Sequence, residues 1–253
     1  MTRRPRPLAQ QVDSGGVHQG YGELPGAGPP LVLLHGVGAR WQVYGPLMVA
    51  LSDHYRQYAP DLRGHGVSSR SADYGIGDFA DDVIAFIADV IGEPAHLYGH
   101  SLGGWVALTV AARRPDLVRS LIIADSGIYP ADIPRETAML WLAGLPLALR
   151  SLAKSLDQFD AQVLAQYHNG RMTRDYDPDA LLARVGCPAL LIQGDAERGA
   201  FMSDHDVRRA TALLGDVRHV HLEGLGHGLH IEDTTGVADT LREFHRTISS
   251  IRS

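Results

Sequence analysis

The stretch LYGHSLGGW, residues 97–105, places Ser101 between two glycines, Gly99 and Gly103. The residues before it have the short apolar pattern of a buried strand, and LGGWVALTVAARRP after it has the pattern of a helix. A sharp turn from strand to helix strains the backbone of its central residue, and flanking glycines remove side chains that would collide there. The spacing Gly-x-Ser-x-Gly therefore predicts a nucleophile elbow that presents the Ser101 hydroxyl beside a helix N-terminus. The alternative interpretation is a glycine-rich loop in which this serine caps the helix.

Strand and helix patterns alternate along the chain on both sides of this turn. Continuous apolar runs such as PLVLLHG are typical of strands that are buried on both faces of a parallel sheet. The alternation is interrupted once, where several helical stretches follow one another without a clear strand. The pattern predicts an α/β fold with a core formed by residues 1–126 and 184–253 and an inserted helical cap over 127–183. A β-hairpin is expected near the N-terminus, with its turn at Ser14 to Gly16.

Composition excludes several classes of protein. The chain has 253 residues, of which 45% are hydrophobic and 21% charged, as in ordinary globular proteins. A formal net charge of -6 provides no positive field for a nucleic-acid partner. The most apolar run, residues 138–149, is too short to span a bilayer, and the basic start MTRRPRP is not followed by an apolar stretch. With Cys187 as the only cysteine, no internal disulfide forms, and a cytoplasmic location is expected. Nothing in these features indicates an oligomeric state.

A serine hydroxyl is a weak nucleophile without a general base, so a histidine must reach Ser101. Among 13 histidines the best candidate is His227, which lies in a glycine-rich loop after a predicted strand late in the chain. A carboxylate must in turn orient this histidine and stabilise its cation. Asp195 and Glu197 follow one predicted strand, and Asp125 follows the strand before it. All three remain candidates for the acid.

Acyl transfer builds negative charge on the carbonyl oxygen of the substrate, so two fixed N–H donors are expected near Ser101. The N–H of Leu102, directly after the nucleophile, is one candidate donor. The loop HGVGARW after the strand LVLLHG supplies the other, and the N–H of Val37 is the natural choice.

Five segments in this order resemble the α/β-hydrolase superfamily, in the branch of small serine hydrolases with a helical lid: LVLLHGVGARWQVY, YAPDLRGHGVSS, YGHSLGGWVAL, PALLIQGDAERGA and GLGHGLHIED. The resemblance implies an eight-stranded, mostly parallel sheet whose second strand is antiparallel, with helices on both faces. It implies Ser101 as nucleophile and His227 as base. Because the family usually writes the acid loop as Gly-x-x-Asp, it ranks Glu197 first, Asp195 second and Asp125 third. A serine at the nucleophile position argues against haloalkane dehalogenases and epoxide hydrolases, which need a carboxylate there.

These features predict a cofactor-free serine hydrolase that acts on a small-molecule substrate. The expected substrate is a small to medium, rather apolar carboxylic ester, thioester or lactone that forms an acyl-enzyme on Ser101. The same triad also serves relatives that cleave carbon–carbon bonds, hydrolyse amides or make peracids. An alternative of another class is a non-catalytic small-molecule receptor on the same fold.

The expected substrate pocket is lined by residues from the two motif loops and the cap: His35, Gly36, His100 and Trp141. An anionic substrate would need a basic residue nearby, and Arg40 and Arg63 are the candidates. For Arg63, bracing of the DLRGHG turn is the alternative role.

Two further patterns carry no cofactor site. His219 and His221 share one face of a predicted strand, but no third ligand at a suitable distance completes a metal site, so a half-buried strand is the preferred interpretation. The glycine-rich stretches lack the dinucleotide fingerprint, which argues against a nicotinamide cofactor.

Overall fold

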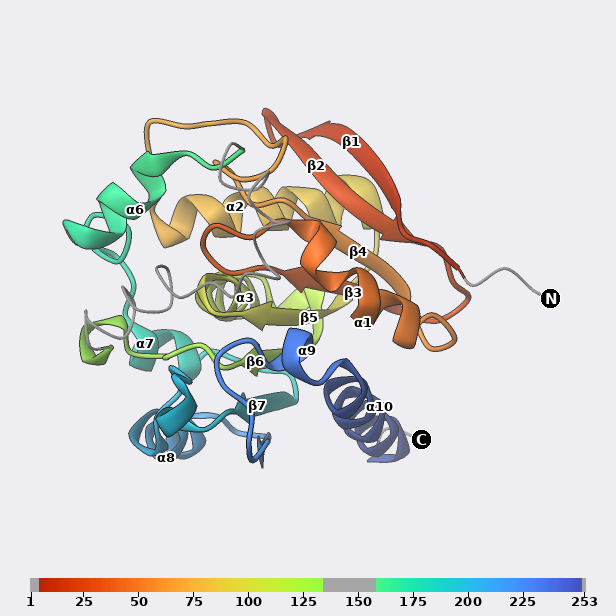
Figure 1. Cartoon of the computed structure of the whole chain (residues 1–253), viewed down its shortest axis with the longest axis vertical. Coiled ribbons are helices and arrows are strands. Elements are labelled where there is room, and N and C mark those ends of the chain that lie inside the picture. Colours follow the sequence, from red (N-terminus) through yellow and green to blue (C-terminus); the bar gives the residue numbers. More distant parts are fainter. Residues whose placement is uncertain (1–4, 134–157, 252–253) are drawn as a thin grey trace.

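The computed structural model describes residues 5–133 and 158–251, which include one eight-stranded sheet in the order β1-β2-β4-β3-β5-β6-β7-β8 (Figure 1). The strands are β1 (Leu8–Ser14), β2 (Val17–Leu24), β3 (Pro30–Leu34), β4 (Arg56–Pro60), β5 (Ala95–His100), β6 (Val118–Ala124), β7 (Ala189–Gln193) and β8 (Val217–His221). The α-helices are α1 (Gly45–Ala50), α2 (Ile76–Phe86), α3 (Leu102–Arg113), α6 (Ala161–His168), α7 (Pro178–Leu182), α8 (Asp204–Leu213), α9 (Leu229–Glu232) and α10 (Thr234–Ile251). Short helical turns of other types are η1 (Trp41–Tyr44), η2 (Ile87–Ile91), η3 (Pro115–Leu117), η4 (Pro130–Asp132) and η6 (Ala196–Arg198).

The pairing of the strands confirms the predicted mostly parallel sheet. The second strand, β2, pairs antiparallel with both β1 and β4, and every other neighbouring pair is parallel. The hairpin β1–β2 closes with Ser14 opposite Val17, so its turn lies where the sequence predicts it. Because parallel strands all end at the same edge of the sheet, the loops after β3, β5, β6 and β7 gather there.

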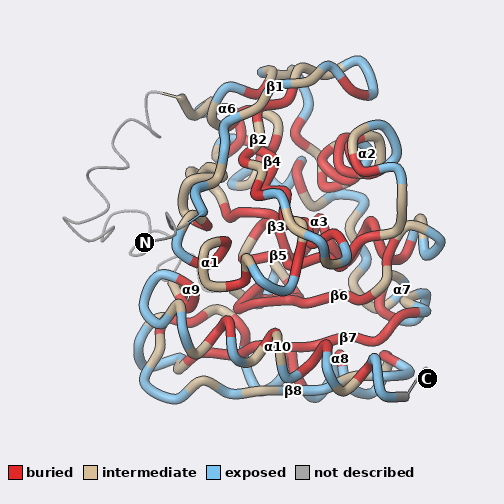
Figure 2. Tube along the Cα trace, turned by 90° about the vertical axis from the view of Figure 1, so that its right-hand side faces the viewer, coloured by how far each residue is buried: buried red, intermediate tan, exposed pale blue. Residues whose placement is uncertain are grey.

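Two apolar layers cover the two faces of the sheet. One contains side chains of α2, α3 and α8, and the other contains side chains of α1 and α10. As a result β3, β5 and β7 are buried along their whole length, which explains their uninterrupted apolar sequences. Figure 2 shows this continuous burial in the middle of the sheet, whereas the edge strand β8 contains only partly buried and exposed residues.

The segment between β6 and β7 contains η4, α6 and α7 in its described parts, and no strand occurs among them. The domain boundaries at 127 and 183 stay a prediction. Trp141 and the apolar run around it lie outside the described residues. Among the helices that the structure describes, none has the length and apolar character needed to cross a bilayer.

Candidate active site

Ser101 lies at the turn between β5 and α3 with φ 55° and ψ −123°, a conformation that side chains other than glycine rarely adopt. The turn needs its glycines because the backbones approach closely. A Cβ atom on Gly99 would lie 2.1 Å from the carbonyl oxygen of Gly103, and one on Gly103 would lie 2.1 Å from that of Leu34. The strained turn predicted from the spacing is therefore confirmed, and it stands at the N-terminus of a helix that is almost entirely buried.

His227 lies in the loop before α9 and contacts a carboxylate in the interior. Its Nδ1 lies 2.7 Å from Oδ2 of Asp125, and both side chains are 0% exposed. The Asp125 carboxylate also accepts hydrogen bonds from the backbone N–H of Phe201 at 2.9 Å and of Met202 at 3.1 Å. Asp125 follows β6 directly and has φ 40°, so its backbone is strained as well. Two backbone N–H donors thus hold this carboxylate against the histidine.

The acid ranking drawn from the sequence is wrong at its first position. Glu197 is exposed on η6. The Asp195 side chain turns outward, where it accepts a hydrogen bond from the backbone N–H of Gly224 at 2.6 Å and lies 2.7 Å from His221. The hydrogen bond from Gly224 is the main cause that lowers the pKa of Asp195. The carboxylate that contacts His227 is the third-ranked Asp125. Asp125 follows β6, the strand beside β5, and its carboxylate turns inward to His227, whereas that of Asp195 turns outward.

Two aromatic contacts fix the ring of His227. The Phe201 ring stacks on it with 3.9 Å between centroids, and the His100 ring lies against it at 4.5 Å. Nε2 of His100 donates a hydrogen bond to the backbone carbonyl of His227 at 2.7 Å. Burial, with the neighbouring histidines, holds the pKa of His100 well below its ordinary value, so this ring is neutral. Because Ser101 follows His100, these contacts bring the histidine loop to the serine turn.

His35 supports the loop that carries Val37. Its Nδ1 donates to the carbonyl of Gly36 at 2.8 Å, and its Nε2 accepts from the N–H of Leu62 at 3.0 Å. Burial lowers the pKa of His35 to about 3, which keeps the ring neutral. His35 is 0% exposed and His100 is 4% exposed. The expectation that these two histidines line a substrate pocket is therefore wrong, since both lie beneath the loops and hold them in place.

Gly36 brings the backbone of this loop against the nucleophile. A Cβ atom on Gly36 would lie 2.9 Å from Cβ and 3.3 Å from Oγ of Ser101. The carbonyl of Gly36 is held by His35 and by the N–H of Ala39 at 3.2 Å. In a trans peptide the C=O and N–H point in opposite directions, so the N–H of Val37 points away from these donors. Val37 stays the predicted partner of Leu102, whose N–H is the first of α3 and has no acceptor within the helix.

A second histidine of the same loop, His230, faces the core. It is 2% exposed and packs against Tyr44 at 4.8 Å and His100 at 4.8 Å between ring centroids. Burial lowers its pKa to about 3. Neither ring nitrogen has a hydrogen-bond partner among the residues that the structure describes. This ring is therefore uncharged and packs as part of the core.

The two basic candidates differ in their contacts. Arg63 holds Asp82 with two hydrogen bonds, Nε to Oδ2 at 2.6 Å and Nη2 to Oδ1 at 2.7 Å, and so braces its turn. Arg40 donates from Nη1 to the neutral side chain of Gln158 at 2.9 Å.

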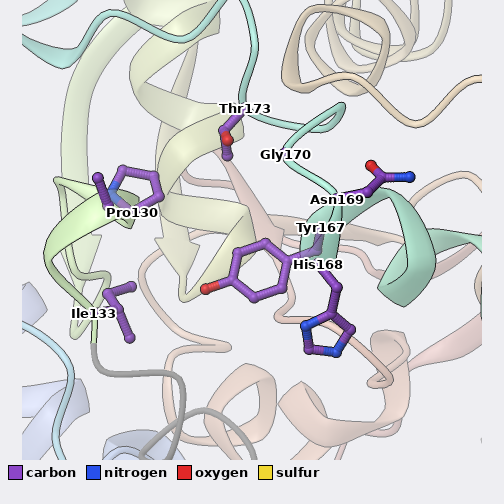
Figure 3. A pocket seen from close by; sticks show the side chains of 8 residues that line it. Pro130, Ile133, Tyr167, His168, Asn169, Gly170 and Thr173 are labelled. Atoms are coloured by element: carbon purple, nitrogen blue, oxygen red, sulfur yellow. The ribbon is translucent and has the colours of Figure 1, made fainter.

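A cavity of about 350 Å³, which the sequence did not predict, opens between η4 and α6. Figure 3 shows Tyr167 extending from α6 toward Ile133, with Pro130 on the side of Ile133 and Thr173 on the segment that follows α6. Its lining residues are Pro130, Ala131, Ile133, Tyr167, His168, Asn169, Gly170 and Thr173. Gly127 lies close to Ile133 of the cavity and to Phe201 of the site, since an added Cβ would meet the Ile133 side chain at 2.8 Å and the Phe201 carbonyl at 2.9 Å. In the described part of the chain, no group of three or more His, Cys, Asp or Glu residues is arranged to hold a metal ion.

Comparison with known proteins agrees with this geometry. Among curated proteins, the chain is 39% identical over 123 residues to 2-(acetamidomethylene)succinate hydrolase of Mesorhizobium japonicum, covering 48% of this chain and 44% of that protein. It is 24% identical over 255 residues to N-formylmaleamate deformylase of Pseudomonas putida, covering 92% and 94%. The chain thus spans less than half of the first relative.

Solved structures show the same fold. The crystal structure of E-2-(acetamidomethylene)succinate hydrolase has a TM-score of 0.81 at 27% identity, with 95% of this chain and 99% of that chain covered. The enol-lactonase from Burkholderia xenovorans has a TM-score of 0.79 at 21% identity, with 94% and 100% covered, a likeness of fold alone. A family model described as Alpha/beta hydrolase family matches residues 31–240. The chain belongs to the alpha/beta hydrolase family.

Proposed function

We propose that this hydrolase is a serine hydrolase that cleaves a small to medium carboxylic ester, thioester or lactone through an acyl-enzyme on Ser101. The observation that carries the proposal is the fully buried contact between His227 and Asp125. The loop of His227 is held by a hydrogen bond from His100, the residue directly before Ser101. A buried histidine–carboxylate pair beside a strained nucleophile turn is the arrangement that serine activation requires.

In the proposed mechanism the Ser101 oxygen attacks the substrate carbonyl and its proton passes to Nε2 of His227. Asp125 accepts the hydrogen bond from Nδ1 and stabilises the imidazolium that forms. The N–H groups of Val37 and Leu102 bind the oxyanion, each donor contributing on the order of 10² to 10³ in rate. The tetrahedral intermediate collapses, and the leaving alcohol or thiol takes the proton from His227. The same histidine then activates water, which releases the carboxylic acid and restores the serine.

Hydrolysis of an amide is the second candidate function. The names of the two curated relatives denote an acetamido compound and an N-formyl compound, both of which carry an acyl group bound to nitrogen. Both names also denote organic acids, a succinate and a maleamate. The same steps apply to an amide, with His227 protonating the leaving nitrogen.

Labelling with a fluorophosphonate probe tests the proposal. We expect the native protein to be labelled and Ser101→Ala to remain unlabelled. Ser126→Ala is the matched control, because the hydroxyl of this neighbouring serine donates to the Ser101 carbonyl at 2.7 Å. We expect this variant to be labelled like the native protein. Hydrolysis of short esters, lactones and N-formyl or N-acetyl amides then ranks the substrate classes. Native protein that stays unlabelled would favour the receptor function over the enzyme.

A further inference from the structure

Arg40 is the last residue of the loop that approaches the nucleophile. The same loop carries Gly36, which packs on Ser101, and Val37, the proposed oxyanion donor. The hydrogen bond from Ala39 N–H to the Gly36 carbonyl closes a turn, and the ends of such a turn lie within about 7 Å. The backbone of Arg40 therefore lies near the serine turn, and its long side chain extends toward Gln158 at the described end of the segment between β6 and β7.

The guanidinium of Arg40 has unused donors. Nη1 donates to the Gln158 carbonyl oxygen, which carries no charge. Nε is buried and has no hydrogen-bond acceptor among the described residues. Within the described ranges no carboxylate lies within the 4.0 Å of an ion pair with Arg40. A partly buried guanidinium without a counter-ion costs free energy, which a carboxylate ligand would recover.

The acidic residue after β4, Asp61, interacts electrostatically with Arg40 but forms no ion pair with it within 4.0 Å. Asp61 is buried, and its Oδ1 accepts the backbone N–H of Trp41 at 2.7 Å. Burial raises the pKa of Asp61 to about 6, and the Trp41 and Val67 hydrogen bonds and the Arg40 charge oppose this rise only in part. Asp61 is therefore engaged in fixing the loop backbone.

The other basic candidate near the loops is closed to a ligand. Nε and Nη2 of Arg63 donate to the two carboxylate oxygens of Asp82 at 2.6 and 2.7 Å, and Nη1 donates to the carbonyl of Asp73 at 3.3 Å. Of these two arginines, Arg63 is neutralised by Asp82, whereas Arg40 forms no ion pair among the described residues.

We propose that Arg40 binds a carboxylate of the substrate, so that this enzyme prefers acyl compounds that carry a second, ionised carboxyl group. This inference rests on the proposed function and specifies its substrate class: half-esters or half-amides of short dicarboxylic acids. The planar guanidinium matches a carboxylate with two parallel hydrogen bonds, a geometry that lysine does not provide. The bound anion fixes the acyl chain while its far carbonyl reaches Ser101.

A matched pair of esters tests the inference. Monoethyl glutarate and diethyl glutarate differ in one charge, and hydrolysis of both is followed by proton release in a pH-stat. The measured quantity is the ratio of kcat/KM for the monoester to kcat/KM for the diester, because damage to the loop lowers both values and leaves the ratio unchanged. Hydrogen bonds to charged groups contribute about 1.5–3 kcal/mol, so Arg40→Gln should lower the ratio about 10- to 100-fold.

Two further variants separate the charge of Arg40 from its shape. Gln158→Glu places a carboxylate at the Arg40 contact, occupies the guanidinium and should lower the same ratio. Arg70→Gln removes an equal charge from an exposed position on the loop after β4 and should leave the ratio unchanged. Equal loss of the ratio in Arg40→Gln and Arg70→Gln would show a general field effect and overturn the proposal.

Calorimetric titration with glutarate keeps the inference independent of catalysis. We expect the native protein to bind glutarate at least about tenfold more tightly than Arg40→Gln. If native protein hydrolyses neither ester, the proposed function fails while glutarate binding still decides the role of Arg40. If both esters are hydrolysed and Arg40→Gln changes neither the ratio nor glutarate binding, the carboxylate site is refuted and the serine hydrolase stands.

Discussion

Replacing Asp125 with asparagine removes the charge of the buried acid and keeps nearly the same side-chain shape. In the native site both carboxylate oxygens face N–H donors. Oδ2 accepts from His227 Nδ1 and from the N–H of Phe201, and Oδ1 accepts from the N–H of Met202. The amide NH₂ of asparagine is only a donor, so it opposes another donor in either orientation.

Each orientation of the new amide in Asp125→Asn damages the site in a definite way. With NH₂ at the Oδ2 position, the amide donates to Nδ1 of His227, and the imidazole proton moves to Nε2, where the base is needed. With NH₂ at the Oδ1 position, the Met202 N–H loses its acceptor and the histidine cation loses its buried counter-charge. We expect kcat to fall about 10³- to 10⁴-fold, or about 4–5.5 kcal/mol in transition-state stabilisation. An unpaired buried N–H costs about 1–3 kcal/mol of folding free energy, so Tm should fall by several degrees.

Initial rates of p-nitrophenyl acetate hydrolysis, measured well below the Tm of the variant, separate the two effects. The matched control is Glu197→Gln, the same chemical change on the exposed carboxylate of η6, which should alter kcat by no more than about twofold. A larger loss in Glu197→Gln than in Asp125→Asn would refute the assignment of the acid. So would an Asp125→Asn enzyme that keeps more than about a tenth of native kcat.

Three other substitutions test the surroundings of the triad. Gly36→Ala puts a Cβ 2.9 Å from Ser101 Cβ and displaces the oxyanion loop, so kcat should fall about 10²-fold or more; an unchanged kcat would contradict the proposed role of the loop. His230 has a pKa of about 3 when folded, below its unfolded value, so its contribution to stability is present above about pH 6.5 and is lost as pH falls toward 3. The Tm of His230→Phe should therefore fall less between pH 7 and pH 4 than the Tm of the native protein. An equal fall would show that His230 is not the cause of the lower stability in acid. Arg63→Gln leaves the Asp82 carboxylate, which is 9% exposed, without its cation and should cost about 3–5 kcal/mol in urea unfolding; a cost below about 1 kcal/mol would show that the pair is not a brace.

The fold and the strained turn at Ser101 could be predicted from the sequence because each leaves a local pattern. Strands buried on both faces, such as β3 and β5, must be apolar throughout. The turn at Ser101 must have small residues at fixed offsets, since Gly99 and Gly103 meet backbone atoms at 2.1 Å. The offsets of these glycines from Ser101 are fixed by the turn itself, so the pattern can be recognised without coordinates.

The acid could not be chosen from the sequence because the choice depends on direction rather than on residue type. Asp125 and Asp195 both follow buried strands, and only the structure shows which side chain turns to His227. Asp125 has a positive φ, which aspartate adopts more readily than most residues, but Asp195 is an aspartate with a negative φ, so residue type does not separate the two. The partner of Arg63 could not be predicted for a similar reason. Asp82 lies on a helix 19 residues later in the chain, and the two side chains meet only because that helix packs beside the loop.

The histidines around the site show how one imidazole is distinguished from its neighbours. His35 and His100 use their ring nitrogens on backbone carbonyl or N–H groups, and His230 is enclosed by aromatic rings. Burial lowers the pKa of all three, because a buried cation without a counter-charge is costly. His227 is equally buried but contacts the Asp125 carboxylate. Under the proposed mechanism, this carboxylate stabilises the proton that Ser101 releases to the ring, and so distinguishes the proposed base from three neighbouring imidazoles.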